Sequence, residues 1–211
     1  MIRIKKNNSF LILIVAAFSL FNSCDEKIQE TKEMKEYVKN LLQERTARDS
    51  SFKFEPHSPF NRDTTIEFEN LKYFDLNPDY IFKSKLFYKD QPDSVVIMGT
   101  KGEARAVLVL GYLELNHNGE THQVNVYRGF SKNGEEYHSI WFTDKTTGNE
   151  TYGVGRYLDI ELNEDKNFIY EIDFNRAYNP YCAYSSLYTC PIPREEDHIK
   201  IFIEAGEKNF H

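Results

Sequence analysis

A loop rich in polar and aromatic side chains offers the first residues that could bind a ligand or do chemistry. The candidate polar site consists of Tyr152, Arg156, Asp173, Asn175 and Asn179. Clefts walled by aromatic side chains and a few amides are typical of sites for sugars and small polar ligands. Asn and Asp side chains in loops also commonly bond their own backbone, which requires no ligand. We favour this structural interpretation and keep ligand binding as the alternative.

The charge of Arg156 limits where this residue can lie. If residues 156–174 form a hairpin with their apolar side chains on one face, Arg156 lies on that face and Asp173 on the other. A direct pair between them is then excluded. A buried guanidinium must find a carboxylate, carbonyl oxygens or a ligand anion, because an unpaired buried charge costs several kcal/mol. Glu150 and Glu207 are the candidate partners, and we favour a structural ion pair over an anion-binding site.

Two cysteines, Cys182 and Cys190, flank a short loop and could form a disulfide. In an oxidising compartment such a pair is a candidate for a bridge, which would contribute about 2 kcal/mol. The alternative is one reactive thiol assisted by His198. That chemistry needs a positioned base and oxyanion donors, which the sequence does not display.

A third group of candidate side chains lies at the tip of an expected hairpin. A two-residue turn at Asn118-Gly119 would pair His117 with Glu120 and would place His122 on the same face, with diagonal neighbours about 7–8 Å apart. Two imidazoles and a carboxylate could hold zinc. Hairpin tips collect polar residues in any case, so we expect no metal here.

Motifs of several enzyme classes are missing from the sequence. Gly153 and Gly155 lack the strand and helix context of a phosphate-binding loop. The sequence contains neither a Gly-x-Ser-x-Gly elbow nor a His-Glu-x-x-His pair. We therefore expect no cofactor and favour a non-catalytic domain.

Apolar spacing predicts one helix upstream of these residues. Its apolar positions are Met34, Tyr37, Val38, Leu41 and Leu42. This periodicity predicts an amphipathic helix from Glu30 to about Arg48. The polar run at residues 49–51 and the prolines Pro56 and Pro59 should end it.

Beyond Pro59 the apolar pattern has a period of two, which is typical of strands. Strands are expected at residues 66–68, 81–88, 95–100, 104–117, 156–162, 168–174 and 199–203, with further strands around Asn118-Gly119 and Asn133-Gly134. Strands joined by turns rather than helices imply antiparallel pairing. We predict a mainly β fold, an antiparallel sheet curled into a barrel or sandwich, with one N-terminal amphipathic helix.

The N-terminus has the features of an export signal with a lipid-attachment site. A basic start is followed by the apolar run of residues 10–21 and then by Asn22-Ser23-Cys24, which resembles a bacterial lipobox of the Bacteroidetes type. Residues 1–23 would be removed, Cys24 would carry acyl chains such as palmitate, 24–32 would be a tether, and 33–211 a single β-rich domain. The alternative is an ordinary cleaved signal peptide with Cys24 incidental.

The charge of the chain limits its partners. The formal net charge is −7, from 26 basic and 33 acidic residues. Such a surface repels phosphate backbones, so nucleic acid is not an expected partner. The signal and the lipobox, not the charge, favour the cell envelope, with the protein anchored to a membrane and facing either the periplasm or the cell surface.

Four blocks of the second half of the chain resemble a known family. They are TYGVGRYL at Thr151 to Leu158, DFNRAYNPYCAY at Asp173 to Tyr184, TCPIP at Thr189 to Pro193, and AGEK at Ala205 to Lys208. Together with LKYF at Leu71 to Phe74, they resemble the bacterial family of domain of unknown function 1684 (DUF1684). The resemblance implies a fold and no established chemistry.

The sequence therefore predicts a membrane-anchored envelope lipoprotein with a non-catalytic domain. That domain would bind a small polar ligand or an envelope component. One alternative is an enzyme acting on a small molecule in a cleft near Arg156, Asn175 and Asn179. The other is a purely structural module.

Overall fold

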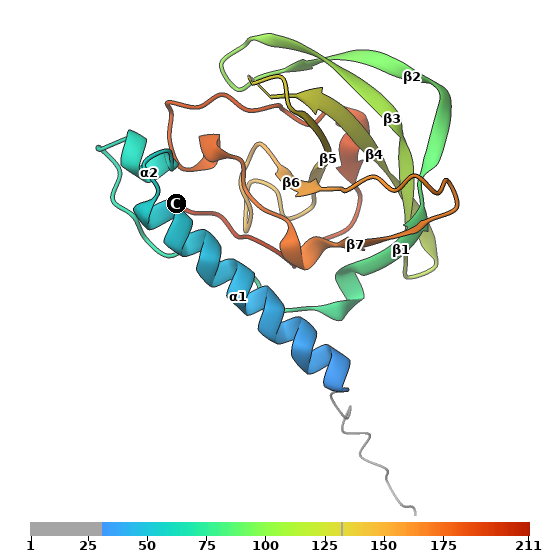
Figure 1. Cartoon of the computed structure of the whole chain (residues 1–211), viewed down its shortest axis with the longest axis horizontal. Coiled ribbons are helices and arrows are strands. Elements are labelled where there is room, and N and C mark those ends of the chain that lie inside the picture. The colour runs from blue at the N-terminus through green and yellow to red at the C-terminus, as the bar shows by residue number, and fades with distance from the viewer. Residues whose placement is uncertain (1–30, 132) are drawn as a thin grey trace, which may run out of the picture.

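The computed structural model describes residues 31–131 and 133–211 (Figure 1). The predicted signal peptide, Cys24 and nearly all of the predicted tether lie outside the described residues. Within those residues, no helix is both long enough and apolar enough to cross a membrane.

A single long helix, α1 (Lys32–Phe54), lies along one side of the β-rich body (Figure 1). Thr31 caps it, because its side-chain oxygen accepts a hydrogen bond of 3.1 Å from the backbone N–H of Met34. The helix continues past the predicted end at Arg48. Asp49 accepts a hydrogen bond from the backbone of Leu71, and Phe52 is buried, so tertiary contacts outweigh the weak helix propensity of this stretch.

Five antiparallel strands form the main sheet, in the order in which they occur in the chain. They are β2 (Phe87–Met98), β3 (Ala104–His117), β4 (Glu120–Phe130), β5 (Glu136–Asp144) and β6 (Arg156–Asp159). A two-residue strand, β8 (His198–Ile199), adds to β5 in parallel. A second, two-stranded sheet pairs β1 (Ile81–Lys85) with β7 (Ile169–Asp173).

The remaining helical elements are short. They are α2 (Pro59–Arg62) and the 3₁₀ turns η1 (Pro78–Tyr80), η2 (Phe174–Arg176), η3 (Tyr181–Ala183) and η4 (Glu195–Asp197). The turns η2, η3 and η4 lie in residues 174–211, which we name the C-terminal segment. This segment lies against the main sheet (Figure 1).

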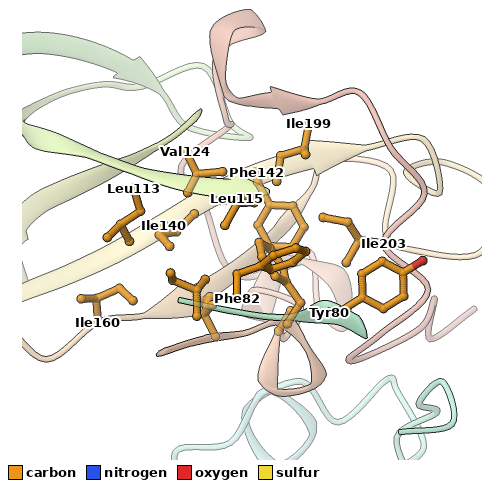
Figure 2. Close-up of a cluster of buried hydrophobic side chains, with 14 of the residues drawn as sticks. Tyr80, Phe82, Leu113, Leu115, Val124, Ile140, Phe142, Ile160, Ile199 and Ile203 are labelled. Atoms are coloured by element: carbon orange, nitrogen blue, oxygen red, sulfur yellow. The ribbon is translucent and has the colours of Figure 1, made fainter. Parts of the chain in front are cut away.

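The main hydrophobic core lies between the two sheets. Figure 2 shows side chains of the main sheet, such as Leu113, Ile140 and Phe142, directed toward Phe82 of the smaller sheet. Trp141 lies between Ile140 and Phe142 in β5 and therefore points to the opposite face. There it belongs to a second buried cluster that includes Tyr127, Tyr157 and Cys190. Both faces of the main sheet are thus covered.

The structure confirms the mainly β, antiparallel fold with one N-terminal helix. The hairpin at Asn118-Gly119 is also confirmed, since His117 lies opposite Glu120 and both turn residues have positive φ angles. The barrel alternative is not supported. Among the described residues, the hydrogen-bonded path runs from β2 to β6 without closing.

Four strand predictions were wrong. The expected strand at residues 81–88 is divided at Leu86 between β1 and β2, which lie in different sheets. Residues 156–174 do not form a hairpin: β6 pairs with β5, and β7 pairs with β1. The apolar side chains of β6 and β7 pack into one core, although the two strands belong to different sheets. An apolar pattern alone cannot tell two strands that share a core from two strands that pair with each other. Residues 66–68 lie in no strand, because Ile66 and Phe68 instead pack beside α1 and α2. Of residues 199–203, only Ile199 is in a strand.

Candidate functional site

A fully buried ion pair, rather than a surface site, holds Arg156. Its Nη2 donates to Asp144 Oδ2 at 2.9 Å and to the carbonyl of Ile203 at 2.8 Å, and its Nη1 donates to carbonyls farther along the C-terminal segment. Burial lowers the pKa of Arg156, and the carboxylate of Asp144 opposes this shift. The partner is therefore Asp144, and the expected side chains of Glu150 and Glu207 do not pair with Arg156.

Asp173 and Asn175 bond the backbone around them. The backbone N–H of Asn175 donates to Asp173 Oδ1 at 3.0 Å, which caps η2. The Asn175 amide exchanges two hydrogen bonds with the backbone of Asn77, at 2.8 and 2.9 Å. The hydroxyl of Tyr37, from α1, donates to Asp173 Oδ2 at 2.7 Å. These side chains join α1 and the loop before β1 to the C-terminal segment.

Asn179 belongs to a buried cluster centred on Glu207. Its backbone N–H and its side-chain amide donate to the two carboxylate oxygens of Glu207, at 3.1 and 3.0 Å. The hydroxyl of Tyr184 donates to the same carboxylate, and Arg48 Nε lies 3.7 Å from it. Burial raises the pKa of Glu207, while Arg48 and these hydrogen bonds lower it. Glu207 is only 1% exposed, so this carboxylate depends on its internal partners.

Tyr152 contacts Cys182 rather than the other predicted site residues. Its hydroxyl donates to the carbonyl of Cys182 at 3.2 Å and lies 3.7 Å from the sulfur. Cys182 and Cys190 are free cysteines in the structure, and the backbone N–H of Cys182 donates to Cys190 Sγ at 3.3 Å. The two cysteines are therefore close in space, and the disulfide between them stays a prediction.

The two histidines at the hairpin tip contact different partners. His117 stacks on Tyr80 at a centroid distance of 5.8 Å, whereas His122 Nε2 lies 3.8 Å from Glu120 Oε2. No group of three or more metal-ligating side chains suited to a metal ion occurs among residues 31–131 and 133–211.

Three adjoining hollows lie between α1, the β5–β6 edge and residues 175–191. The smallest, which we name the α1 cavity, has a volume of about 210 Å³. Its polar lining consists of Glu44, Arg45, Arg48, Tyr73, Asn175 and Arg176. The other two hollows, of about 690 and 580 Å³, share Tyr157, Asp159 and Tyr178, and we name them together the aromatic groove. Tyr178 borders all three hollows.

The aromatic groove combines flat aromatic surfaces with carboxylates. Its aromatic lining is Tyr137, Trp141, Tyr157, Tyr178, Tyr181 and Tyr188. The hydroxyl of Tyr178 donates to Asp159 Oδ1 at 2.9 Å, and the guanidinium of Arg48 lies 4.8 Å from the centre of the Tyr178 ring. The groove therefore offers stacking surfaces beside charged hydrogen-bonding groups.

Arg45 is the cation of the α1 cavity that lacks a carboxylate. Its Nη1 and Nη2 donate to the carbonyls of Phe74 and Asn175 at 3.2 and 3.3 Å, and the guanidinium lies 4.3 Å above the ring of Tyr73. Its Nε and the Tyr73 hydroxyl are buried without a hydrogen-bond partner. Within the described part of the chain, no carboxylate forms a salt bridge with Arg45. Burial lowers the pKa of Arg45.

Comparison with known proteins places most of these residues in one family. The model of a family described as a protein of unknown function (DUF1684) matches residues 66–208. The chain belongs to the DUF1684 family. This DUF1684 chain is also similar to the solution NMR structure of an uncharacterised protein from Haloarcula marismortui. The TM-score is 0.61 and the identity 29%, with 83% of this chain and 96% of the other covered. No curated protein matches the chain.

Only part of the lining of the α1 cavity lies in the range that matches the DUF1684 family. Tyr73, Asn175 and Arg176 lie inside the matched range, whereas α1, with Arg45 and Arg48, precedes it. Neither arginine is among the site residues predicted from the sequence. A signal was present: Leu41, Arg45, Arg48 and Phe52 are spaced so that they share one helix face, and Leu41 and Phe52 are buried. Arginines on the packed face of a helix indicate buried polar partners.

Proposed function

We propose that this DUF1684 protein is a membrane-anchored envelope lipoprotein of Bacteroidetes type, whose β-rich domain binds a small polar ligand carrying an anionic group. The anion would lie in the α1 cavity and the rest of the ligand along the aromatic groove. The main support for this assignment is Arg45, a half-buried guanidinium with no carboxylate partner in the described chain and one unpartnered N–H.

The chemistry of Arg45 favours an anionic ligand over a neutral one. A partly buried charge without a salt-bridge partner is unfavourable, and a ligand carboxylate or phosphate would offset it. Guanidinium N–H groups form short, charge-assisted hydrogen bonds with such anions. The hydroxyl of Tyr73, which has no hydrogen-bond partner, could donate to the same ligand. Buried polar atoms without partners are unusual in proteins, and two of those in the described chain, Arg45 Nε and the Tyr73 hydroxyl, belong to residues that line this cavity.

The aromatic groove suits the remainder of such a ligand. Tyr178 borders both the α1 cavity and the groove, so a ligand held at Arg45 would pass over its ring. The tyrosine faces can stack on a flat apolar surface, and Asp159 can accept hydrogen bonds from hydroxyl groups. An acidic sugar combines these features.

The ligand proposal predicts a thermal shift that depends on Arg45. Ligand at a hundred times its dissociation constant should stabilise the full-length protein by about 2.7 kcal/mol, which raises Tm by about 5–10 °C. We expect acidic sugars and other small carboxylates to produce this shift in differential scanning fluorimetry, and their neutral analogues to produce none. Arg45→Gln should abolish the shift relative to its own unliganded Tm.

Lys39→Gln is the matched control, because it removes one positive charge from the exposed face of the same helix. It should preserve the ligand-induced shift. If no small anion stabilises the wild-type protein, or if Arg45→Gln responds as the wild type does, the proposed site is wrong. In the first case a structural module becomes the better assignment.

Lipid anchoring predicts a separate result for Cys24. Acyl chains on this thiol would hold the protein at the membrane, since two chains suffice for stable anchoring. Cys24→Ser should move the protein from the membrane fraction to the soluble fraction and should abolish labelling by a palmitate analogue. Cys182→Ser is the control and should leave both unchanged. Equal membrane binding by Cys24→Ser would contradict the anchor.

A further inference from the structure

The two cysteines adjoin one another and differ in environment. The backbone N–H of Cys182 donates to Cys190 Sγ at 3.3 Å, so the Cα of Cys182 lies within about 5 Å of that sulfur. This spacing is compatible with a disulfide, in which Cα atoms lie about 4.4–6.8 Å apart. Cys182 is partly exposed, whereas Cys190 is buried and lines the aromatic groove.

We propose that Cys182 and Cys190 form a reversible dithiol–disulfide pair, in which Cys182 is the attacking thiol and Cys190 the resolving thiol. This inference is independent of the proposed ligand. It rests on the contact between the residues and on the polar groups that surround them.

Hydrogen bonds around the pair favour a thiolate at Cys182. Donation from the Cys190 thiol, together with hydrogen bonds from Tyr152 and Thr100, lowers the pKa of Cys182 to about 7, although burial opposes the shift. Donation to Cys182 and burial raise the pKa of Cys190. Thr100 Oγ1 also accepts a 3.2 Å hydrogen bond from the backbone N–H of Cys190, which fixes that residue. A purely structural disulfide does not require this difference in pKa between the two thiols.

The reaction is balanced with a small-molecule disulfide as oxidant. The Cys182 thiolate attacks one sulfur of the oxidant, a mixed disulfide forms, and the oxidant's S–S bond breaks to release one thiolate. Cys190 then transfers its proton to the departing thiolate and attacks Cys182 Sγ, which displaces the second thiolate. The protein dithiol is oxidised to a disulfide, and the small disulfide is reduced to two thiols.

The test uses full-length protein in glutathione buffers of varied redox ratio. Free thiols are trapped by alkylation and identified by peptide mapping, which separates them from Cys24. We expect both thiols to be lost together in oxidising buffer and recovered in reducing buffer. Cys190→Ser should accumulate a stable mixed disulfide with one glutathione at Cys182, whereas Cys182→Ser should form one at Cys190 at least tenfold more slowly.

A second measurement requires no cysteine variant. Iodoacetamide should alkylate Cys182 at least tenfold faster than Cys190 in the wild-type protein, with a half-maximal rate near pH 7. Tyr152→Phe removes one donor to the thiolate and should move the half-maximal rate to higher pH. Equal alkylation rates for the two thiols would overturn the proposal. A disulfide that reducing glutathione buffer cannot open would overturn it as well, because the bridge would then be structural.

Discussion

Asp144→Ala is expected to lower the free energy of unfolding by about 3–5 kcal/mol, because it leaves the guanidinium of Arg156 buried without a counter-charge. Neither side chain is exposed by more than 1%, and the two are joined at 2.9 Å. Asp144 Oδ1 also accepts hydrogen bonds from the backbone and hydroxyl of Thr146, at 2.7 and 2.6 Å. For a chain of this length the loss corresponds to a decrease in Tm on the order of 10 °C, measurable by thermal denaturation.

Two further variants separate the charge from the hydrogen bonds. Asp144→Asn keeps the size and one acceptor oxygen, so it should lose less stability than Asp144→Ala. The double variant Asp144→Leu/Arg156→Met removes both charges and should recover part of the loss, since apolar replacements of buried pairs are often neutral. A single variant Asp144→Ala with unchanged Tm would show that the pair contributes nothing to stability.

Local chemistry made parts of this fold predictable from sequence. The Asn118-Gly119 turn fixed its hairpin because only a few residue types adopt positive φ readily, and β3 has the predicted bounds, 104–117. The preference for structural loop bonds at Asp173 and Asn175 relied on the same kind of short-range chemistry.

Pairing between distant segments was less predictable. The strand that lies beside β7 is β1, whose residues are about ninety positions earlier in the chain. Because β6 and β7 both direct apolar side chains into one core, an incorrect hairpin satisfies the same pattern. The error also misplaced the partner of Arg156, since Asp144 lies in β5, the true neighbour of β6.

The candidate binding site required the tertiary structure. Its cavity is formed by α1 on one side and by Tyr73, Asn175 and Tyr178 on the other, and these three parts are far apart in the sequence. Arg45 becomes notable only when the structure shows that its guanidinium bonds two carbonyls and, among the described residues, forms no salt bridge with a carboxylate. The sequence indicated polar and aromatic residues near 175–184 but could not place a helix over them.

Glu207→Ala is expected to detach α1 from the β-rich body and to cost about 3 kcal/mol, because one buried carboxylate satisfies groups on several segments. The carboxylate accepts hydrogen bonds from Asn179 and Tyr184 and pairs with Arg48 of α1. Without it, the backbone N–H of Asn179 and the hydroxyl of Tyr184 lose their acceptor in the interior, and the helix loses a charged contact. The loss should appear in thermal denaturation, and hydrogen exchange should become faster in α1 than in β3 and β4.

Glu44→Ala tests whether this effect comes from burial rather than from charge alone. Glu44 also joins α1 to the C-terminal segment, through a 3.1 Å ion pair with Arg176, but both side chains are nearly half exposed. Exposed pairs contribute about 0–1 kcal/mol, since water solvates the separated charges well. Glu44→Ala should therefore leave Tm and helix exchange almost unchanged. If both variants had equally small effects, contacts other than the Glu207 cluster, such as the burial of Leu41 and Phe52, would have to hold α1 in place.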